Sequence, residues 1–579
     1  MQPVDFTTLA AAHAELCQNW IPARIQQVYQ QNRHTIAIAL RTLKKKDWLI
    51  ISWHPQGARI CIGNCDTRIA RDTFTFSTVL RHQLKGYALI AIKAMAPWER
   101  VLDFQFAQRP EEPPCWHLIV EIIGKYSNVI LTDANNQIIT VAHQVTEAKS
   151  SLRTVETGQS YQFPPPLTGS FPKLTESRQS WQERVSLIPG TIKRQLLQSY
   201  CGLSPALVQS MVLAAGLNPN QSTHSLAPSD WQKLFERWQE WLQALKSSSF
   251  HPGFNENGYS VMGWGNTKPV ENVQTLLERY YTEQLNQEVF QQLHHQLKQR
   301  LNRLLAKLSQ KADTFSQRLK QSHNAQEYRT HADLLMSHLH RWEPGMTSIT
   351  LSDYITGKPV IIALNPSQNG VQNAQRLYKL HQKLKRARTA LLPLLQEVEE
   401  EKAYLEQVQE SLNQLESYQQ PTDLQALEEI REELIQQQYL KVKEKRSLGN
   451  REESVPYCYV TPSGFPLWIG RNNSQNDRLT FRTAKDYDLW FHTQEIPGSH
   501  VLLRLEPGAV AGETDLQFAA DLTAYYSGGR QSEQVPVVYT RPKYVYKPKG
   551  AKPGMAIYKR ERILWGRPQQ ALDYLSKNK

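Results

Sequence analysis

Two long stretches of the chain keep a hydrophobic repeat of seven residues, which is typical of a coiled-coil seam. In residues 273–340 the repeat is carried by Leu297, Leu301, Leu304, Leu308 and Phe315. In residues 371–445 it is carried by Leu384, Leu391, Val398, Leu405 and Leu412, with Ala387, Leu394, Val408 and Leu415 in the alternate position. A short strand-rich insert near 346–366 separates the two stretches. The pattern therefore predicts a long antiparallel coiled-coil arm over 273–445 with a small β-rich tip.

The length of the arm is its most distinctive property. At 1.5 Å per residue, a helix of about 65 residues is on the order of 100 Å long. Pro393 lies inside the second stretch and is expected to kink it. A heptad stripe by itself indicates only packing, so any function of the arm would come from its reach.

Residues 1–165 predict an N-terminal α+β domain. A helix is expected near 7–18 and another at 75–85, and strands are expected at 23–30, 35–40 and 48–53. Residues 117–133 predict a β-hairpin that turns between Gly124 and Asn128. The Pro- and Gly-rich stretch 158–172 marks the end of this domain.

Residues 175–246 predict a helical domain with a helix-hairpin-helix. Ser204 is placed as a helix N-cap, and Pro205 follows at the first helical position. The backbone N–H groups at such a hairpin can hold a phosphate. An ordinary helical hairpin without a ligand fits these residues equally well, since Ser204 stands where a second glycine is usual.

Residues 450–579 predict a C-terminal α+β domain that contains an unusually polar motif. Gly470 and Gly498 suggest turns between strands. An ordinary turn does not need the polar side chains gathered around them, which are Arg471, Asn472, Asn473, Asn476, Asp477, His492, Ser499 and His500. We refer to these eight residues as the polar motif. The two histidines lie eight positions apart without a nearby cysteine, which gives little support for a metal site.

Residues 541–562, the basic strip, contain eight Lys or Arg against one Glu, with three tyrosines interleaved. The strip is predicted to be an extended segment, and alternating basic and aromatic residues on such a segment suit phosphate contact combined with base stacking. A solvated basic edge strand is the alternative. The net charge of +13 and the isoelectric point near 9.2 favour a polyanionic partner over a membrane surface, for which no basic amphipathic helix with an apolar anchor is seen.

Several classes of protein are disfavoured by what the sequence lacks. We expect no signal peptide, no membrane span, no cofactor and no bound metal, and we expect reduced cysteines in a cytoplasmic protein. No P-loop, zinc-protease or nucleophile-elbow pattern occurs. A DNA glycosylase that uses a proline amine as its nucleophile would need that amine free, whereas Pro3 follows two other residues.

Several segments resemble the NEMF/RqcH (NFACT) family, also described as fibronectin-binding protein A-like. The resemblance is carried by 470–477 (GRNNSQND), 488–492 (DLWFH) and 497–501 (PGSHV), and it continues through 519–527, 547–554, 121–131 and 363–387. It implies a bacterial ribosome quality-control factor that binds obstructed large ribosomal subunits, and hence rRNA and peptidyl-tRNA. It also implies recruitment of tRNA, alanyl-tRNA in the bacterial members, for untemplated tailing of the stalled nascent chain.

In this interpretation the ribosome makes the peptide bond, so the chain is expected to be a positioning factor and not an enzyme, with neither DNA nor membrane as partner. The resemblance places tRNA contacts at Asp5, Arg24, Arg81, Glu99 and Arg100, where Glu99 replaces the family's aspartate. RNA or ribosome contacts are expected from seven residues of the polar motif (Arg471, Asn472, Asn473, Asn476, Asp477, His492 and His500) and from Lys543, Lys547, Lys549 and Lys552. A surface adhesin that binds fibronectin, or a nucleic-acid-binding scaffold outside translation, would be the alternative.

Overall fold

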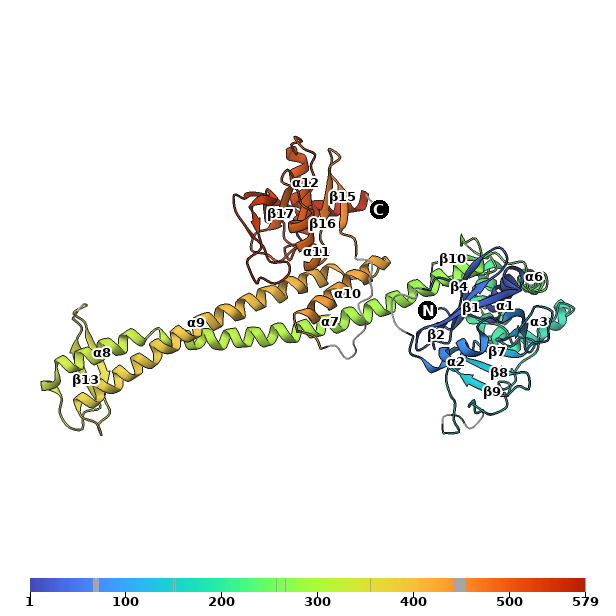
Figure 1. Cartoon of the computed structure of the whole chain (residues 1–579), viewed down its shortest axis with the longest axis horizontal. Helices are drawn as coiled ribbons and strands as arrows, with labels where there is room; N and C mark the ends of the chain where they lie inside the picture. Colours follow the sequence, from blue (N-terminus) through green and yellow to red (C-terminus); the bar gives the residue numbers. More distant parts are fainter. Residues whose placement is uncertain are drawn as a thin grey trace. The chain divides into compact units, whose positions relative to one another are not determined.

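The computed structural model describes residues 1–65, 72–148, 150, 153–256, 258–265, 267–354, 356–441 and 454–577. These residues form two compact units, one of residues 1–288 and one of residues 289–577 (Figure 1). The predicted mixed α+β multidomain class is confirmed, with long helices and several sheets. The predicted boundary between arm and C-terminal domain, at 445–450, lies outside the described residues.

The N-terminal region is built on one antiparallel sheet of nine strands in the order β4-β3-β2-β1-β5-β6-β7-β8-β9. Its core contains apolar side chains from α1 (Phe6–Trp20), from α2 (Thr75–Leu84) and from the strands. The predicted helices near 7–18 and 75–85 and the predicted hairpin, which is β7–β8, are confirmed. The strands are β1 (Ala23–Asn32), β2 (Thr35–Arg41), β3 (Lys46–Ser52), β4 (Arg59–Gly63), β5 (Ala88–Ala94), β6 (Val101–Ala107), β7 (Trp116–Glu121), β8 (Asn128–Asp133) and β9 (Ile138–Val141).

A tryptophan-rich helical section follows in the same unit. It contains α3 (Arg178–Ser186), α4 (Ile192–Ser199), α5 (Pro205–Ala214) and α6 (Pro228–Ser247). Ser204 caps α5 by accepting a hydrogen bond from Leu207 N at 3.0 Å, with Pro205 at the start of the helix, as the sequence predicts. A small sheet of β10 (Gly253–Asn255), β11 (Gly258–Ser260) and β12 (Lys268–Pro269) was not predicted.

The two predicted heptad stretches each divide into two helices. The first becomes α7 (Val273–Ser322) and α8 (Ala325–Ser337), and the second becomes α9 (Gly370–Gln414) and α10 (Pro421–Gln436). Prolines are favourable at the first positions of a helix, and Pro421 begins α10 in this way. The hairpin of β13 (Ser348–Ser352) and β14 (Pro359–Ala363) forms the predicted β-rich insert. The helix α9 runs through Pro393 without being divided.

The buried seam of the arm is shorter than the heptads predict. Leu297, Leu301 and Leu308 of α7 pack with Val398, Leu405 and Leu412 of α9, and four apolar residues of α10 join them. The base of the arm is therefore a three-helix bundle. Leu394, predicted for the seam, is 43% exposed. In the described ranges no helix combines the length and apolar character that a bilayer crossing requires.

The C-terminal domain is built on a six-stranded sheet in the order β15-β16-β18-β17-β19-β22. Apolar residues of α12 (Glu513–Tyr525) and α13 (Pro568–Lys577) pack on one of its faces. The strands are β15 (Tyr457–Val460), β16 (Pro466–Ile469), β17 (Leu489–Thr493), β18 (Val501–Leu503), β19 (Val535–Thr540) and β22 (Arg562–Gly566).

Two local predictions in this domain were wrong. Residues 470–473 do not make a turn between strands, because Asn472 caps the helix α11 (Asn473–Arg478) instead. The basic strip is not one extended segment, because it folds into a short hairpin of β20 (Val545–Tyr546) and β21 (Ile557–Tyr558).

Candidate nucleic-acid interface

Arg471 of the polar motif is buried at the base of the arm, with 2% of its surface exposed. Its guanidinium donates to Asp423 Oδ1 at 2.5 Å and to Thr422 Oγ1 at 3.1 Å, both on α10. The same group lies 4.5 Å from the centre of the Tyr457 ring. The charge of Arg471 is thus satisfied by the protein itself.

The two following asparagines also bond to α10. Asn472 Nδ2 donates to Glu429 Oε2 at 2.5 Å, and Asn473 Nδ2 donates to Glu433 Oε1 at 3.0 Å. Burial raises the pKa of Glu433 to about 7, although hydrogen bonds from Asn473 and from the Tyr404 hydroxyl oppose that shift. We call Asp423, Glu429 and Glu433 the docking face of α10, since together they bind the C-terminal domain.

The loop around Gly498 attaches to α9 in a similar way. Gln407 accepts from Gly498 N at 3.1 Å and donates to Gly498 O, and Gln414 accepts from the Ser499 hydroxyl at 3.1 Å. A side chain at Gly498 would place its Cβ 2.8 Å from Ser527 Cβ, so the position requires glycine.

The histidines of the polar motif lie in the packing of the domain. His500 Nδ1 is 2.7 Å from Thr480 Oγ1, and Trp490 Nε1 donates to the same hydroxyl at 3.0 Å. Burial lowers the pKa of His500 to about 3 and also lowers the pKa of His492. Both rings are therefore neutral at physiological pH. Asn476 of the polar motif is also used within the domain, since its Oδ1 accepts from His500 N at 3.1 Å. RNA contact by the polar motif stays a prediction.

The lysines of the basic strip fall into two groups. Lys547 pairs with Asp477, which also accepts from Gly554 N at 3.0 Å. Lys552 donates to the Tyr439 hydroxyl and lies 4.7 Å from the centre of the Tyr404 ring, so it packs on the arm. Lys543 and Lys549 are exposed. Of the four lysines predicted to contact RNA, these two are therefore the most open to an external phosphate.

Three of the five predicted tRNA residues lie together in the N-terminal unit. Asp5 accepts from Ser204 Oγ at 2.5 Å, which ties the start of α1 to the helical hairpin. Arg100 donates to the Val4 carbonyl at 3.1 Å; burial lowers its pKa, while the charges of Asp5 and Glu99 oppose the shift. Burial raises the pKa of Glu99, although the backbone of Leu167 and the charge of Arg100 oppose this.

Trp98 fixes the backbone that presents Glu99 and Arg100. Its φ of 65° is in the left-handed region, which non-glycine residues rarely adopt. The indole packs on Phe6 and Trp241, with ring centroids 4.9 and 5.5 Å away. It also lies against Gly202, where a Cβ would come within 2.5 Å of the ring. The helical hairpin thus supports the loop that carries the predicted Glu99-Arg100 pair.

Arg24 and Arg81 lie elsewhere in the same unit, Arg24 on β1 and Arg81 on α2. Arg24 is exposed on β1 opposite Ala88, at the start of β5, whereas Glu99 and Arg100 follow the end of β5. The seven-residue strand between them spans roughly 20 Å. Arg81 pairs with Asp72 at 2.6 Å and donates to Val28 O at 3.2 Å. The structure therefore does not bring all five residues into one site.

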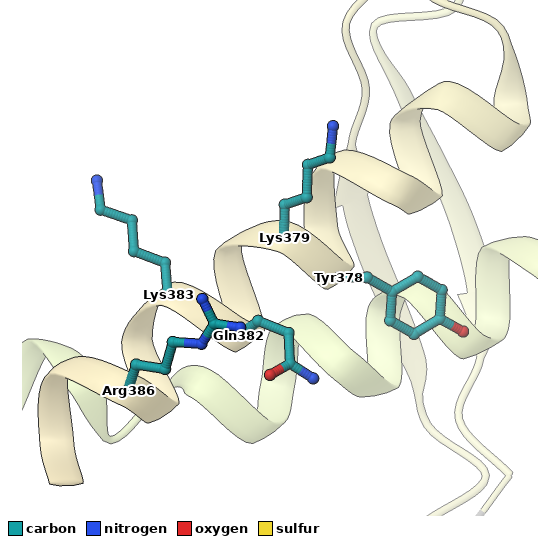
Figure 2. Close-up of a pocket in the computed structure, with 5 residues that line it drawn as sticks. All are labelled: Tyr378, Lys379, Gln382, Lys383 and Arg386. Carbon is teal, nitrogen blue, oxygen red and sulfur yellow. The ribbon is translucent and has the colours of Figure 1, made fainter.

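A basic face on α9 is a candidate site that the sequence analysis missed. Lys379, Lys383 and Arg386 are exposed and border a hollow that Tyr378 and Gln382 also line. Figure 2 shows Lys379 and Lys383 projecting to the same side of the helix. The nearby carboxylate of Asp333 accepts from the Tyr378 hydroxyl and lies 3.8 Å from Arg329. We call Lys379, Lys383 and Arg386 the basic face.

The signal for this face is the segregation of charge along the helix. Residues 370–396 contain six Lys or Arg and no Asp or Glu, and four glutamates fall within 397–401. Like charges three and four positions apart on a helix repel one another. A surface that keeps such repulsion is suited to an anionic partner.

Comparison with known proteins identifies the family of this chain. Residues 5–453 match the family model for NFACT N-terminal and middle domains, and residues 455–559 match the NFACT protein RNA binding domain. The chain belongs to the NFACT family.

Curated relatives extend over nearly the full chain. The Rqc2 homolog RqcH of Streptococcus suis is 31% identical over 563 residues, covering 95% of each chain. The protein of the same name in Bacillus subtilis is 29% identical over 569 residues, covering 96% of each. The solved C-terminal part of a fibronectin/fibrinogen-binding protein from Streptococcus suis is 31% identical, with a TM-score of 0.38, and covers 50% of this chain and 98% of its own.

Proposed function

We propose that this protein is a ribosome quality-control factor that binds obstructed large ribosomal subunits carrying peptidyl-tRNA. It recruits tRNA, specifically alanyl-tRNA, for untemplated C-terminal tailing of the stalled nascent chain. The observation that carries the proposal is the family match, which runs from residue 5 to residue 559 and includes an RNA-binding domain. The protein is a positioning factor, and the ribosome makes the peptide bond.

The distribution of exposed charge supports this function. The chain carries a net charge of +13, and the basic face of α9 presents three cations that face no local carboxylate on their own stretch of helix. Cations that replace the counterions of RNA phosphates bind without reading sequence, which suits attachment to rRNA. Contacts in several parts of one chain raise avidity without any single tight site.

The N-terminal cluster is proposed as the tRNA site. The Arg100 guanidinium uses one nitrogen on the Val4 carbonyl and keeps further N–H groups for a phosphate or a base edge. Glu99 lies beside it and supplies an acceptor. The longer side chain of Glu99, relative to the family's aspartate, alters the reach of that acceptor by one methylene.

The test is to purify the protein from cells and measure its RNA. Wild type should carry large-subunit RNA and a tRNA population enriched in alanine acceptors. Arg100→Ala should lose most of the tRNA and keep the large-subunit RNA, because the basic face and the RNA-binding domain are unchanged. Arg109→Ala is the matched control, since the side chain of this arginine, in the segment that follows β6, is 82% exposed and its loss should change neither.

Thermal unfolding of the same variants separates binding from folding. Loss of large-subunit RNA in step with the melting temperature would contradict the tRNA assignment. Recovery of DNA or of an extracellular matrix protein in place of ribosomal RNA would overturn the proposed function.

A further inference from the structure

The edge strand β22 of the C-terminal sheet carries apolar residues on both faces. Leu564 packs into the core beneath α12 and α13. Ile563 and Trp565 point to the opposite face and are 53% and 57% exposed. Edge strands usually carry charged residues, and apolar residues on both faces are typical of a strand covered on both sides.

The rest of this sheet face is covered by the protein itself. Trp490 of β17 and Val538 of β19 are buried against Val545 and Tyr558 of the β20–β21 hairpin. In the strand register Ile563 lies opposite Val538, and Trp565 lies opposite Pro536. The β20–β21 hairpin therefore covers β17 and β19 but not the edge strand β22. The Trp565 indole lies beside this covered area.

Cations border the exposed pair at the start of β22. Lys559 and Arg560 precede the strand, and the Arg560 guanidinium lies 4.9 Å from the centre of the Tyr544 ring and donates to its hydroxyl at 3.0 Å. Lys543 approaches the same ring at 5.3 Å. The five residues of β22 span about 16 Å, at roughly 3.3 Å per residue. Aromatic surface beside a row of cations is the usual combination for binding single-stranded nucleic acid.

We propose that Trp565, flanked by Ile563, stacks against a base of single-stranded RNA whose phosphates pass Lys559, Arg560 and Lys543. The proposal rests on the proposed function in taking RNA as the ligand. It extends the RNA site beyond residue 559, where the match to the family's RNA-binding domain ends. A protein strand added to the free edge of β22 would use the same surface, but the cationic border is complementary to a polyanion.

The test uses the full chain and a short labelled single-stranded oligoadenylate, with affinity measured by fluorescence anisotropy. Trp565→Ala should weaken binding roughly tenfold, because one base loses the aromatic ring on which it stacks. Trp565→Phe should keep most of the affinity. Val510→Ala is the matched control, since Val510 is an apolar residue of the same domain with 87% exposure, and it should leave binding unchanged.

An abasic oligonucleotide of the same length distinguishes stacking from charge. Wild type and Trp565→Ala should bind it equally, because the phosphates remain and the bases are gone. An equal loss on both ligands, or no loss on oligoadenylate, would overturn the proposal. So would reduced co-sedimentation with large subunits alongside unchanged oligoadenylate binding, which would indicate a protein contact. Oligoadenylate stacking in a protein that carries no ribosomal RNA would refute the proposed function and leave this inference standing.

Discussion

The polar motif and the basic face of α9 are both rich in hydrogen-bonding side chains, and the protein uses them in opposite ways. Arg471 is 2% exposed and is bonded to Asp423 on another helix. Lys379 and Lys383 are exposed on the helix that carries them. A concentration of polar residues in a sequence can therefore mark a joint inside the protein or a surface for a partner, and only the distribution of compensating charge separates the two.

Removing the charge of Arg471 is expected to have the largest effect, and it tests whether the polar motif is an internal joint. Arg471→Met should destabilise the second unit by about 3–5 kcal/mol, because Asp423 is left buried without its cation. Differential scanning calorimetry of the full chain would show the transition of this unit moving to lower temperature. Arg482→Ala, an exposed arginine of the same domain, should leave the transition in place.

A double variant tests the reason for that loss. Arg471→Met combined with Asp423→Asn should be more stable than Arg471→Met alone, because the unpaired charge is gone. The new amide oxygen could still accept from Gln419 N and Gln420 N, as the carboxylate of Asp423 does at 2.8 and 2.9 Å. If the double variant is the less stable of the two, burial of an uncompensated charge is not the cause.

The second largest effect is expected in the pH dependence of folding stability, to which Glu433 contributes. Because burial raises its pKa to about 7 from an ordinary value of 4.5, the native state holds the proton over this interval while the unfolded state releases it. Stability supplied by the protonated form is present below about pH 4.5 and is lost as the pH rises through 7. A shift of this size corresponds to roughly 3 kcal/mol.

Glu433→Gln keeps the acceptor for Tyr404 and Asn473 and cannot ionise. The variant should therefore gain stability relative to wild type as the pH rises from 5 to about 7.5. Melting temperatures of both proteins across this range would show the difference growing with pH. Parallel pH profiles would mean that Glu433 does not titrate within the fold.

The smallest effect on stability is expected at the basic face. Replacing Lys379, Lys383 and Arg386 together by Gln should change the free energy of unfolding by about 0.5 kcal/mol or less, since the side chains are exposed. Binding to large subunits should fall, and its log–log dependence on salt should flatten by about 0.7–0.9 for each phosphate that the variant no longer neutralises. Co-sedimentation over a series of salt concentrations measures both quantities.

A charge-matched control removes the effect of net charge. Lys173, Lys233 and Lys246 are exposed lysines of the first unit, and replacing them by Gln lowers the net charge equally. This control should keep the salt dependence of wild type. Equal reductions in both triple variants would mean that binding follows net charge and not the basic face.

The sequence predicted those elements whose signal is local. The cap at Ser204 and the heptads around Leu301 and Leu405 depend on neighbours a few positions away, and the structure contains both features. The helix α10 was absorbed into a longer pattern, because its own apolar residues also recur three and four positions apart, while Pro421 restarts the helix.

The burial of the polar motif could not be predicted in this way. Arg471 and Asp423 are 48 positions apart, and no sequence pattern around either residue indicates that the two form a pair. Among the predicted tRNA residues, Asp5 at the start of α1 meets Arg100 just before β6, 95 positions away, whereas Arg24 pairs with the opposite end of β5. The basic face could have been predicted from residues 370–396, which contain no Asp or Glu. The heptad pattern in the same segment was instead interpreted as packing alone.

The uneven burial along the arm has a mechanical consequence. Between residues 382 and 397 of α9 no side chain is fully buried, and the same holds for residues 309–321 of α7, whereas the bundle at the base and the tip each have a buried core. Bending stiffness in a pair of helices comes from side chains that must slide past one another. The middle of the arm is therefore its most compliant section, about 24 Å long at 1.5 Å per residue. Thermal bending there would move the tip relative to the base of the arm. The C-terminal domain, which is bound to the base, would keep its position on α9 and α10.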